Sequence, residues 1–248
     1  MCTVTIVPMG KQADGFRMAC SRDESHGRPA ALPPIQDERD GVRFVMPIDP
    51  GSGGTWVAVN EHGLALTLLN YNLPDPPTGR DRSRGDVIPA VLSASNVQEV
   101  LDRLEVIERD RMMPFRLVAC DGRSVMLWRS TEPADQVEIT RWNGDPMMWT
   151  SSGLGDHLVE GPRRELFDAW FADDLPLSFT EDQLAFHCHQ WPGREHLSVC
   201  MHREDARTVS YTTVDVNAEQ IRLTYHPDRP DREAEDRWED FKRRLVQR

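Results

Sequence analysis

The sequence has no excess of positive charge. Its 248 residues include 29 lysines and arginines against 41 aspartates and glutamates, which gives a formal net charge of -12. Nonspecific nucleic-acid binders and proteins that bind anionic membranes need a basic surface to meet phosphate groups. The composition therefore predicts a protein with no nucleic-acid partner.

Long hydrophobic segments are also missing. No apolar run approaches the roughly 20 residues of a membrane-spanning helix. The N-terminus lacks the basic segment and apolar region of a signal peptide. We therefore expect a cytoplasmic protein with no membrane span.

Cysteine is scarce and follows no paired pattern. The sequence has Cys2, Cys20, Cys120, Cys188 and Cys200, with no CxxC motif. An odd number without such pairs fits neither a disulfide framework nor a zinc ribbon. Reduced thiols are expected, and the position of Cys2 is the unusual one.

The first two strands are predicted to form a hairpin that begins at Cys2. Residues 2–8 and 16–22 have strand character, and a glycine-bounded turn lies between them. A hairpin centred near Gln12 places Cys2 opposite Arg22. The first strand is therefore expected to start beside the sequence SRDE.

Strand patterns recur along the rest of the chain. They cover two segments around the turn NEHG, the second ending at Asn70, then a hairpin at 115–130 and the stretches 136–141, 147–151, 196–203, 208–216 and 220–226. Helical spacing is found at 83–92, 95–109, 161–173 and 180–190, and a charged terminal segment, about 228–248, is predicted as an amphipathic helix. This order is typical of an α+β fold with antiparallel sheets and helices outside them, here as a single domain over 1–248.

Cys2 has a chemistry that follows from its position. A free thiol has a pKa of about 8.5, so only a small fraction is the nucleophilic thiolate at neutral pH. If Met1 is removed, the α-amine of Cys2, with a pKa of about 7.7–8.0, can act as the base for its own thiol. Nucleophile and base would then belong to one residue.

Three further side chains could complete such a site. Arg22 can stabilise the thiolate, Asp23 can hold the amine, and Asn70 can donate to the oxyanion that forms when a carbonyl is attacked. Each residue alone also has an ordinary structural interpretation: a buried cysteine, a surface ion pair and a turn asparagine.

A resemblance that covers most of the chain supports the catalytic interpretation. The stretches MCTVTIVP, ACSRDESHGRPA, GGTWVAVNEHGLALTLLNYN, SRGDVIPAVL and WTSSGLGD resemble the NRDE-motif family, the relatives of transport and Golgi organisation protein 2. Ser21 stands where the motif has asparagine, whereas Arg22, Asp23 and Glu24 agree. A more distant similarity is to the cysteine-type N-terminal nucleophile hydrolases, such as choloylglycine hydrolase, penicillin V acylase and isopenicillin N acyltransferase.

The distant similarity implies a fold and a set of roles. The fold would be a four-layer αββα sandwich of two antiparallel sheets. Cys2 would be the nucleophile, Asp23 would hold the amine, and Asn70 would serve the oxyanion. The positions where those hydrolases have a second asparagine and a later arginine fall at Ser151 and at Arg163 or Arg164.

Two functions follow from the resemblance. The first is an amidohydrolase or acyltransferase that acts on a small nonpeptide amide and needs no cofactor. The alternative is a binding or carrier protein of the same fold for haem or another apolar ligand, because animal members of the NRDE family are associated with haem trafficking and lipid metabolism.

Two other patterns are interpreted as structural. The cluster of His187, Cys188, His189, Cys200 and His202 has metal-ligand chemistry. However, on a helix the first and third of these point about 200° apart, whereas a shared metal favours spacing by four. The glycines of GSGGTW are not followed by Lys-Ser/Thr, so no phosphate loop is predicted. Gly53 and Gly54 are expected to let the backbone pass close to the active-site strand, with Trp56 packing beneath. No metal site is expected.

Overall fold

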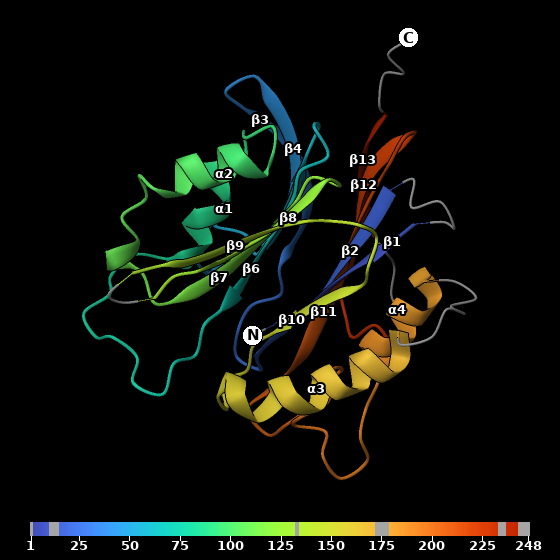
Figure 1. The fold of residues 1–248 in the computed structure, drawn as a ribbon. Helices are drawn as coiled ribbons and strands as arrows, with labels where there is room; N and C mark the ends of the chain where they lie inside the picture. The colour runs from blue at the N-terminus through green and yellow to red at the C-terminus, as the bar shows by residue number, and fades with distance from the viewer. Residues whose placement is uncertain (1, 10–14, 132–133, 172–178, 233–236, 243–248) are drawn as a thin grey trace.

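Two antiparallel sheets packed face to face form the centre of the protein, and helices cover the outer face of each (Figure 1). The structure is a computed structural model that describes residues 2–9, 15–131, 134–171, 179–232 and 237–242. Among these residues, no helix combines the length and the apolar character that crossing a bilayer requires.

The first sheet carries the N-terminus on an interior strand. Its order is β10-β1-β2-β11-β12-β13. The strands are β1 Cys2–Pro8, β2 Gly15–Ser25, β10 Met147–Thr150, β11 Ala206–Asn217, β12 Gln220–His226 and β13 Arg237–Lys242. The start of β1 is therefore bordered by a strand on each side.

The second sheet is a meander in which each strand pairs with the next along the chain. Its order is β3-β4-β5-β6-β7-β8-β9. The strands are β3 Leu32–Arg39, β4 Val42–Ile48, β5 Val57–Asn60, β6 Ala65–Asn70, β7 Phe115–Cys120, β8 Ser124–Arg129 and β9 Gln136–Arg141. Antiparallel neighbours can be joined by short turns, but residues 71–114, between β6 and β7, contain the helices of this half of the protein.

Alternation along β1 separates the interior from the helix layer. Cys2, Val4 and Ile6 pack in the core between the sheets. Thr3 and Thr5 point to the other face, where they meet side chains from the helices. Successive residues of a strand point to opposite faces, so the thiol of Cys2 faces the space between the sheets.

Two helical layers complete the sandwich. Helices α1 Val87–Val91 and α2 Val97–Leu104 pack on the second sheet, with the short 3-10 helices η1 Arg84–Asp86 and η2 Arg109–Arg111 nearby in sequence. Helices α3 Asp156–Phe171 and α4 Phe179–Cys188 lie against the first sheet (Figure 1). The side chain of Asn96 caps α2 by accepting from the Glu99 amide, as Ser or Asn at this position is expected to do.

The structure confirms the predicted fold class and the predicted hairpin register. Both sheets are antiparallel, and the layers run helix, sheet, sheet, helix. In the β1–β2 pair, Cys2 lies directly opposite Arg22.

Two predicted elements are wrong. Residues 196–203 form turns with one isolated bridge at His202, not a strand, and the carbonyls of Leu197 and Ser198 accept instead from the guanidinium of Arg163. Within the predicted terminal helix, Arg237–Lys242 is the strand β13, which pairs with the open edge of β12. Residues 233–236 and 243–248 of that prediction lie outside the described part of the chain.

Candidate active site

A cavity of about 500 Å³ lies where β1 begins and where β2 and β6 end. Its lining includes Cys2, Arg22, Asp23 and Asn70, four of the residues that the sequence predicts for the site. The volume is in the range of small-molecule sites. Strand ends from both sheets therefore bring the predicted side chains to one place.

The backbone of Cys2 is held by Ser151, which follows β10. The Cys2 amide donates to the Ser151 Oγ at 3.2 Å, and the Ser151 amide donates to the Cys2 carbonyl at 2.9 Å. Both residues are buried, Cys2 with 4% of its surface exposed. Ser151 thus contacts the first strand at the position that carries the thiol.

The thiol of Cys2 has a second cysteine beside it. A hydrogen bond from Cys20 lowers the pKa of Cys2; burial opposes this effect and the charge of Arg22 adds to it. The pKa of Cys20 is raised well above its ordinary value by the same hydrogen bond and by burial. The Cys20 thiol therefore stays protonated and donates a hydrogen bond to the Cys2 sulfur.

Sequence reasoning assigned no role to Cys20, although the signal was present. Cys20 lies opposite Val4, two residues along β2 from Arg22 and on the same face as Cys2. Diagonal neighbours of this kind are within reach in an antiparallel pair. The predicted hairpin register was enough to identify the pair of thiols.

Arg22 is buried and its charge is compensated. Its guanidinium donates to Asp49 at 2.5 Å and to Glu24 at 3.2 Å. The Cζ atom lies 4.4 Å from the ring centroid of Trp56, a cation–π distance. Trp56 does pack beneath the site as the sequence indicated, whereas Asp49 was missed because it follows a strand without any motif.

Asp23 is buried beside the same cavity. The hydroxyl of Thr208 donates to its Oδ1 at 2.7 Å. Burial raises the pKa of Asp23, and the positive charge of Arg163 opposes the rise. The carboxyl group is thus held between the cavity and the layer behind the first sheet.

Arg163 lies in that layer behind the sheet and contacts the cavity residues only indirectly. It is 1% exposed and donates to the Thr3 hydroxyl at 2.9 Å and to the Thr150 hydroxyl at 2.7 Å. Burial lowers its pKa, and the Asp23 charge opposes this. Arg164, the alternative, donates to the Met148 carbonyl instead, so Arg163 is the arginine that faces β1.

Asn70 ends β6 with its side chain available to a ligand. It lines the cavity, and among the described residues its amide group has no hydrogen-bond partner. Asn72, in contrast, donates from its side chain to Asp156 at 3.0 Å. Of the two asparagines in NYN, the structure thus leaves Asn70 to face the cavity.

The histidine and cysteine cluster is a packing feature. The two ring nitrogens of His187 lie 2.8 Å from the Thr5 hydroxyl and 2.7 Å from the Ser21 hydroxyl. Burial, with the nearby charge of Arg163, lowers the pKa of His187 to about 3. Within the described ranges, no three His, Cys, Asp or Glu side chains are grouped as metal ligands would be. Ser21, the residue that departs from the NRDE motif, therefore faces α4.

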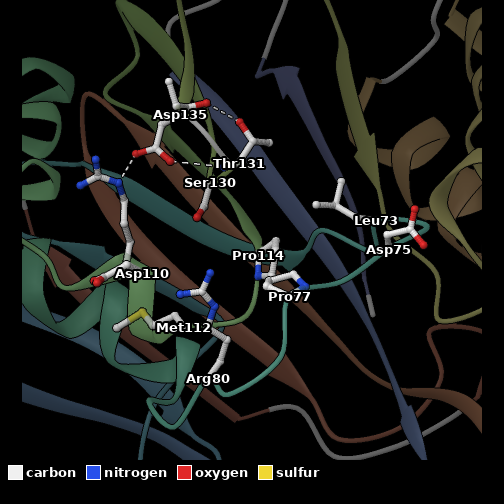
Figure 2. Close-up of a pocket in the computed structure, with 12 residues that line it drawn as sticks. Leu73, Asp75, Pro77, Arg80, Asp110, Met112, Pro114, Ser130, Thr131 and Asp135 are labelled. Atoms are coloured by element: carbon white, nitrogen blue, oxygen red, sulfur yellow. Dashed lines mark hydrogen bonds and ion pairs between the residues drawn. The ribbon is translucent and has the colours of Figure 1, made fainter.

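A second cavity, of about 440 Å³, has a different lining (Figure 2). Arg109 and Asp135 form an ion pair in it, and Leu73, Pro77 and Arg80 belong to the segment that leads from β6 to the first cavity. None of the predicted site residues lines it. The chemistry expected from the sequence therefore belongs to the cavity at Cys2.

The fold is that of the N-terminal nucleophile hydrolases. A Caenorhabditis elegans N-acylethanolamine-hydrolyzing acid amidase ortholog matches with a TM-score of 0.52 at 9% identity, over 86% of this chain and 92% of that chain. The C2A mutant of conjugated bile acid hydrolase from Clostridium perfringens matches with a TM-score of 0.55 at 12% identity, over 97% of this chain and 92% of that chain. At these identities the likeness shows the fold alone.

The sequence assigns the family. The model of the Transport and Golgi organisation 2 family matches residues 1–170, and the chain belongs to that family. A search of curated proteins found no match to the sequence.

Proposed function

We propose that the protein is an N-terminal cysteine amidohydrolase or acyltransferase that acts on a small nonpeptide amide. The observation that carries the proposal is that one cavity is lined by the thiol of Cys2, the guanidinium of Arg22 and the side-chain amide of Asn70, which has no hydrogen-bond partner among the described residues. These are a nucleophile, a cation beside it and a donor for an oxyanion. The two proteins of similar fold are an N-acylethanolamine-hydrolyzing acid amidase ortholog and a conjugated bile acid hydrolase, and hydrolysis of such amides is the reaction class proposed here.

The nucleophile is activated in two ways in this mechanism. Removal of Met1 turns the nitrogen of Cys2 into a free amine, which takes the thiol proton directly or through water. The hydrogen bond from Cys20 and the charge of Arg22 stabilise the thiolate, in agreement with the lowered pKa of Cys2. The hydroxyl of Ser151, 3.2 Å from the Cys2 nitrogen, accepts one amine hydrogen and orients the base.

The reaction then follows the usual course of acyl transfer. The sulfur of Cys2 attacks the amide carbonyl carbon, and the side-chain amide of Asn70 donates to the oxyanion. The carbon–nitrogen bond breaks as the protonated amine of Cys2 returns its proton to the leaving amine. Water or an acceptor amine attacks the thioester and releases the acyl group.

Asp23 and Arg163 have positioning roles in this proposal. Asp23 is buried where its negative charge stabilises the protonated amine of Cys2. Arg163 compensates that carboxylate from behind the sheet and ties Thr3 to Thr150, which fixes β1 against β10.

A reducing compartment suits the chemistry. All five cysteines are free thiols in the structure. A nucleophilic thiol next to a second thiol is stable to oxidation where glutathione and thioredoxin keep cysteines reduced. The proposed location is therefore the cytoplasm, as expected from the sequence.

The test combines intact mass with acyl-enzyme trapping. We expect purified protein to lack Met1, and an N-acyl p-nitroanilide to release p-nitroaniline and leave the acyl mass on Cys2. Cys2→Ala should abolish both signals, and Cys120→Ala, which removes a buried thiol elsewhere, should retain them. Active protein that keeps Met1 would overturn the self-activated mechanism. Haem binding that is equal in wild type and Cys2→Ala, without turnover in either, would instead favour the carrier function.

A further inference from the structure

Positively charged side chains are frequent in the lining of the cavity at Cys2, although binding a neutral amide does not require them. Five arginines among the described residues line it. Four of them have a carboxylate partner: Arg22 with Asp49 at 2.5 Å, Arg28 with Asp49 at 2.8 Å, Arg82 with Glu108 at 2.9 Å and Arg203 with Asp205 at 2.6 Å. The fifth, Arg84, is different.

The guanidinium of Arg84 has no ion-pair partner within the described part of the chain. Its one hydrogen bond runs from Nη1 to the Pro114 carbonyl at 3.1 Å. The side chain is half-buried, and burial lowers its pKa. The charge of Glu24 opposes this effect of burial, but Glu24 forms no ion pair with Arg84 in the described part of the chain. A desolvated cation without a paired carboxylate is costly, and an anionic ligand would offset that cost.

The backbone that carries Arg84 is fixed on both sides. The Ser83 hydroxyl accepts from the Gly85 amide at 3.1 Å, and the Thr55 amide donates to the Gly85 carbonyl at 3.3 Å. Gly54 packs directly on this turn, since a Cβ at Gly54 would lie 2.4 Å from the Gly85 carbonyl oxygen. The backbone at Arg84 is therefore fixed. Within the described part of the chain, the remaining N–H groups of its guanidinium have no hydrogen-bond partner.

The charges of the side chains that line the cavity favour a ligand with one negative charge. An arginine fork binds carboxylates and phosphates in bidentate geometry. A phosphate monoester has about 1.5 to 2 negative charges at pH 7, and four carboxylates also line the cavity, those of Asp23, Glu24, Asp49 and Asp205. One guanidinium without an ion pair in the described part of the chain, among these acids, matches a single carboxylate better than a phosphate.

We propose that Arg84 binds a carboxylate on the amide substrate, so that the preferred substrates are carboxylate-bearing amides such as N-acyl amino acids. This inference rests on the proposed function of the Cys2 site. The carboxylate would lie at one end of the cavity and the scissile carbonyl at Cys2, within a volume of about 500 Å³.

The test compares matched substrates and matched variants. The substrates are N-hexanoylglycine, its neutral carboxamide analogue, and glutaric acid monoanilide, which carries the carboxylate on the acyl side. The variants are Arg84→Gln and, as a control that removes the same charge outside the cavity, Arg111→Gln, whose side chain is half-exposed and paired with Asp81. The readout is kcat/KM for release of the acyl group.

We expect the wild type to prefer one of the two carboxylate substrates over the neutral analogue. In Arg84→Gln, kcat/KM for that substrate should fall by about 10- to 100-fold, the effect of losing a charged hydrogen-bond pair. The neutral analogue should change less than about threefold, and Arg111→Gln should keep the preference. An equal loss for charged and neutral substrates, or no preference in the wild type, would overturn the proposal.

Binding separates this inference from the proposed function. In Cys2→Ala, calorimetry with N-hexanoylglycine and with glutaric acid monoanilide should show a site that Cys2→Ala/Arg84→Gln lacks. Arg84-dependent binding without turnover by the wild type would sustain the carboxylate site and refute the enzyme. Turnover by the wild type without any preference for a carboxylate would support the enzyme and refute the carboxylate site.

Discussion

Ser151 binds both backbone groups of Cys2, although the two residues are 149 positions apart in the sequence. The hydroxyl accepts from the Cys2 nitrogen and the amide donates to the Cys2 carbonyl. This contact joins the start of β1 to the end of β10 and places the thiol in the cavity. The neighbours of Cys2 therefore come from β2 and from the residue that follows β10.

The first prediction concerns the two adjacent thiols. Cys20→Ala removes the hydrogen bond that lowers the pKa of Cys2, so the pH midpoint for alkylation of Cys2 by iodoacetamide should move upward. Peptide mass spectrometry over pH 5–10 measures this midpoint. Cys120→Ala should leave it in place, because Cys120 belongs to the other sheet, where burial and the charge of Asp121 raise its pKa to about 12. An unchanged midpoint in Cys20→Ala would show that the hydrogen bond has no effect.

The second prediction concerns the oxyanion donor. Asn70→Ala should lower kcat of the proposed reaction by about 10²- to 10³-fold, the usual cost of losing such a donor. Asn70→Asp should be equally slow because a carboxylate cannot donate. The matched control is Asn72→Ala, which removes the hydrogen bond to Asp156 and leaves the cavity lining intact. Steady-state kinetics measures kcat for each variant. If Asn72→Ala is slower than Asn70→Ala, the assignment of Asn70 as the oxyanion donor is wrong.

The third prediction concerns acid stability. His187 has a folded pKa of about 3 against an ordinary value of 6.5, so the unfolded chain takes up a proton that the folded protein excludes. Its contribution to stability is complete above pH 6.5 and is lost as the pH falls toward 3, at up to about 1.4 kcal/mol per pH unit. Urea denaturation at pH 7.5, 6.0 and 5.0 measures the loss, and His187→Gln should reduce the slope.

An NMR titration gives an independent check on His187. In the wild type, the His187 imidazole should remain neutral at pH 5, because burial lowers its pKa to about 3. A His187 resonance that titrates near pH 6.5 would contradict the buried, neutral assignment.

The fourth prediction concerns the contact between Gly54 and Gly85. Gly54→Ala places a methyl group 2.4 Å from the Gly85 carbonyl oxygen and should cost about 1–3 kcal/mol, as overpacking usually does. The free energy of unfolding measures this cost. Gly27→Ala, where a Cβ meets no atom within 4 Å, should cost less than 1 kcal/mol. Equal stability of the two variants would mean that the turn around Arg84 is not tightly packed.

Local patterns were sufficient to predict much of the fold. The β1–β2 register followed from one short hairpin, because fixing its turn fixes every cross-strand pair, including Cys2 with Arg22. The end of β6 at Asn70 was also predicted. The strand β2, in contrast, runs to Ser25, three residues beyond the predicted end, so Asp23 lies within the strand and not after it.

Contacts between distant segments were not accessible in this way. The pairing of β10 with β1 joins strands from the two halves of the chain, so Ser151 could be placed only by resemblance. Residues 196–203 alternate like a strand, but the Arg163 guanidinium takes the carbonyls of Leu197 and Ser198. The charged terminal segment pairs as β13 because β12 offers an open edge, which no local propensity reveals.

Because β1 is an interior strand that pairs with β10, the cavity at Cys2 can form only after β10 has been synthesised. A nascent chain emerging from the ribosome carries Cys2 as an ordinary cysteine, since the contact with Ser151 requires the 149 residues that follow. Loop closure over such a separation is a late event in folding. A translation product that stops before β10 would therefore have the thiol but not the complete cavity around it.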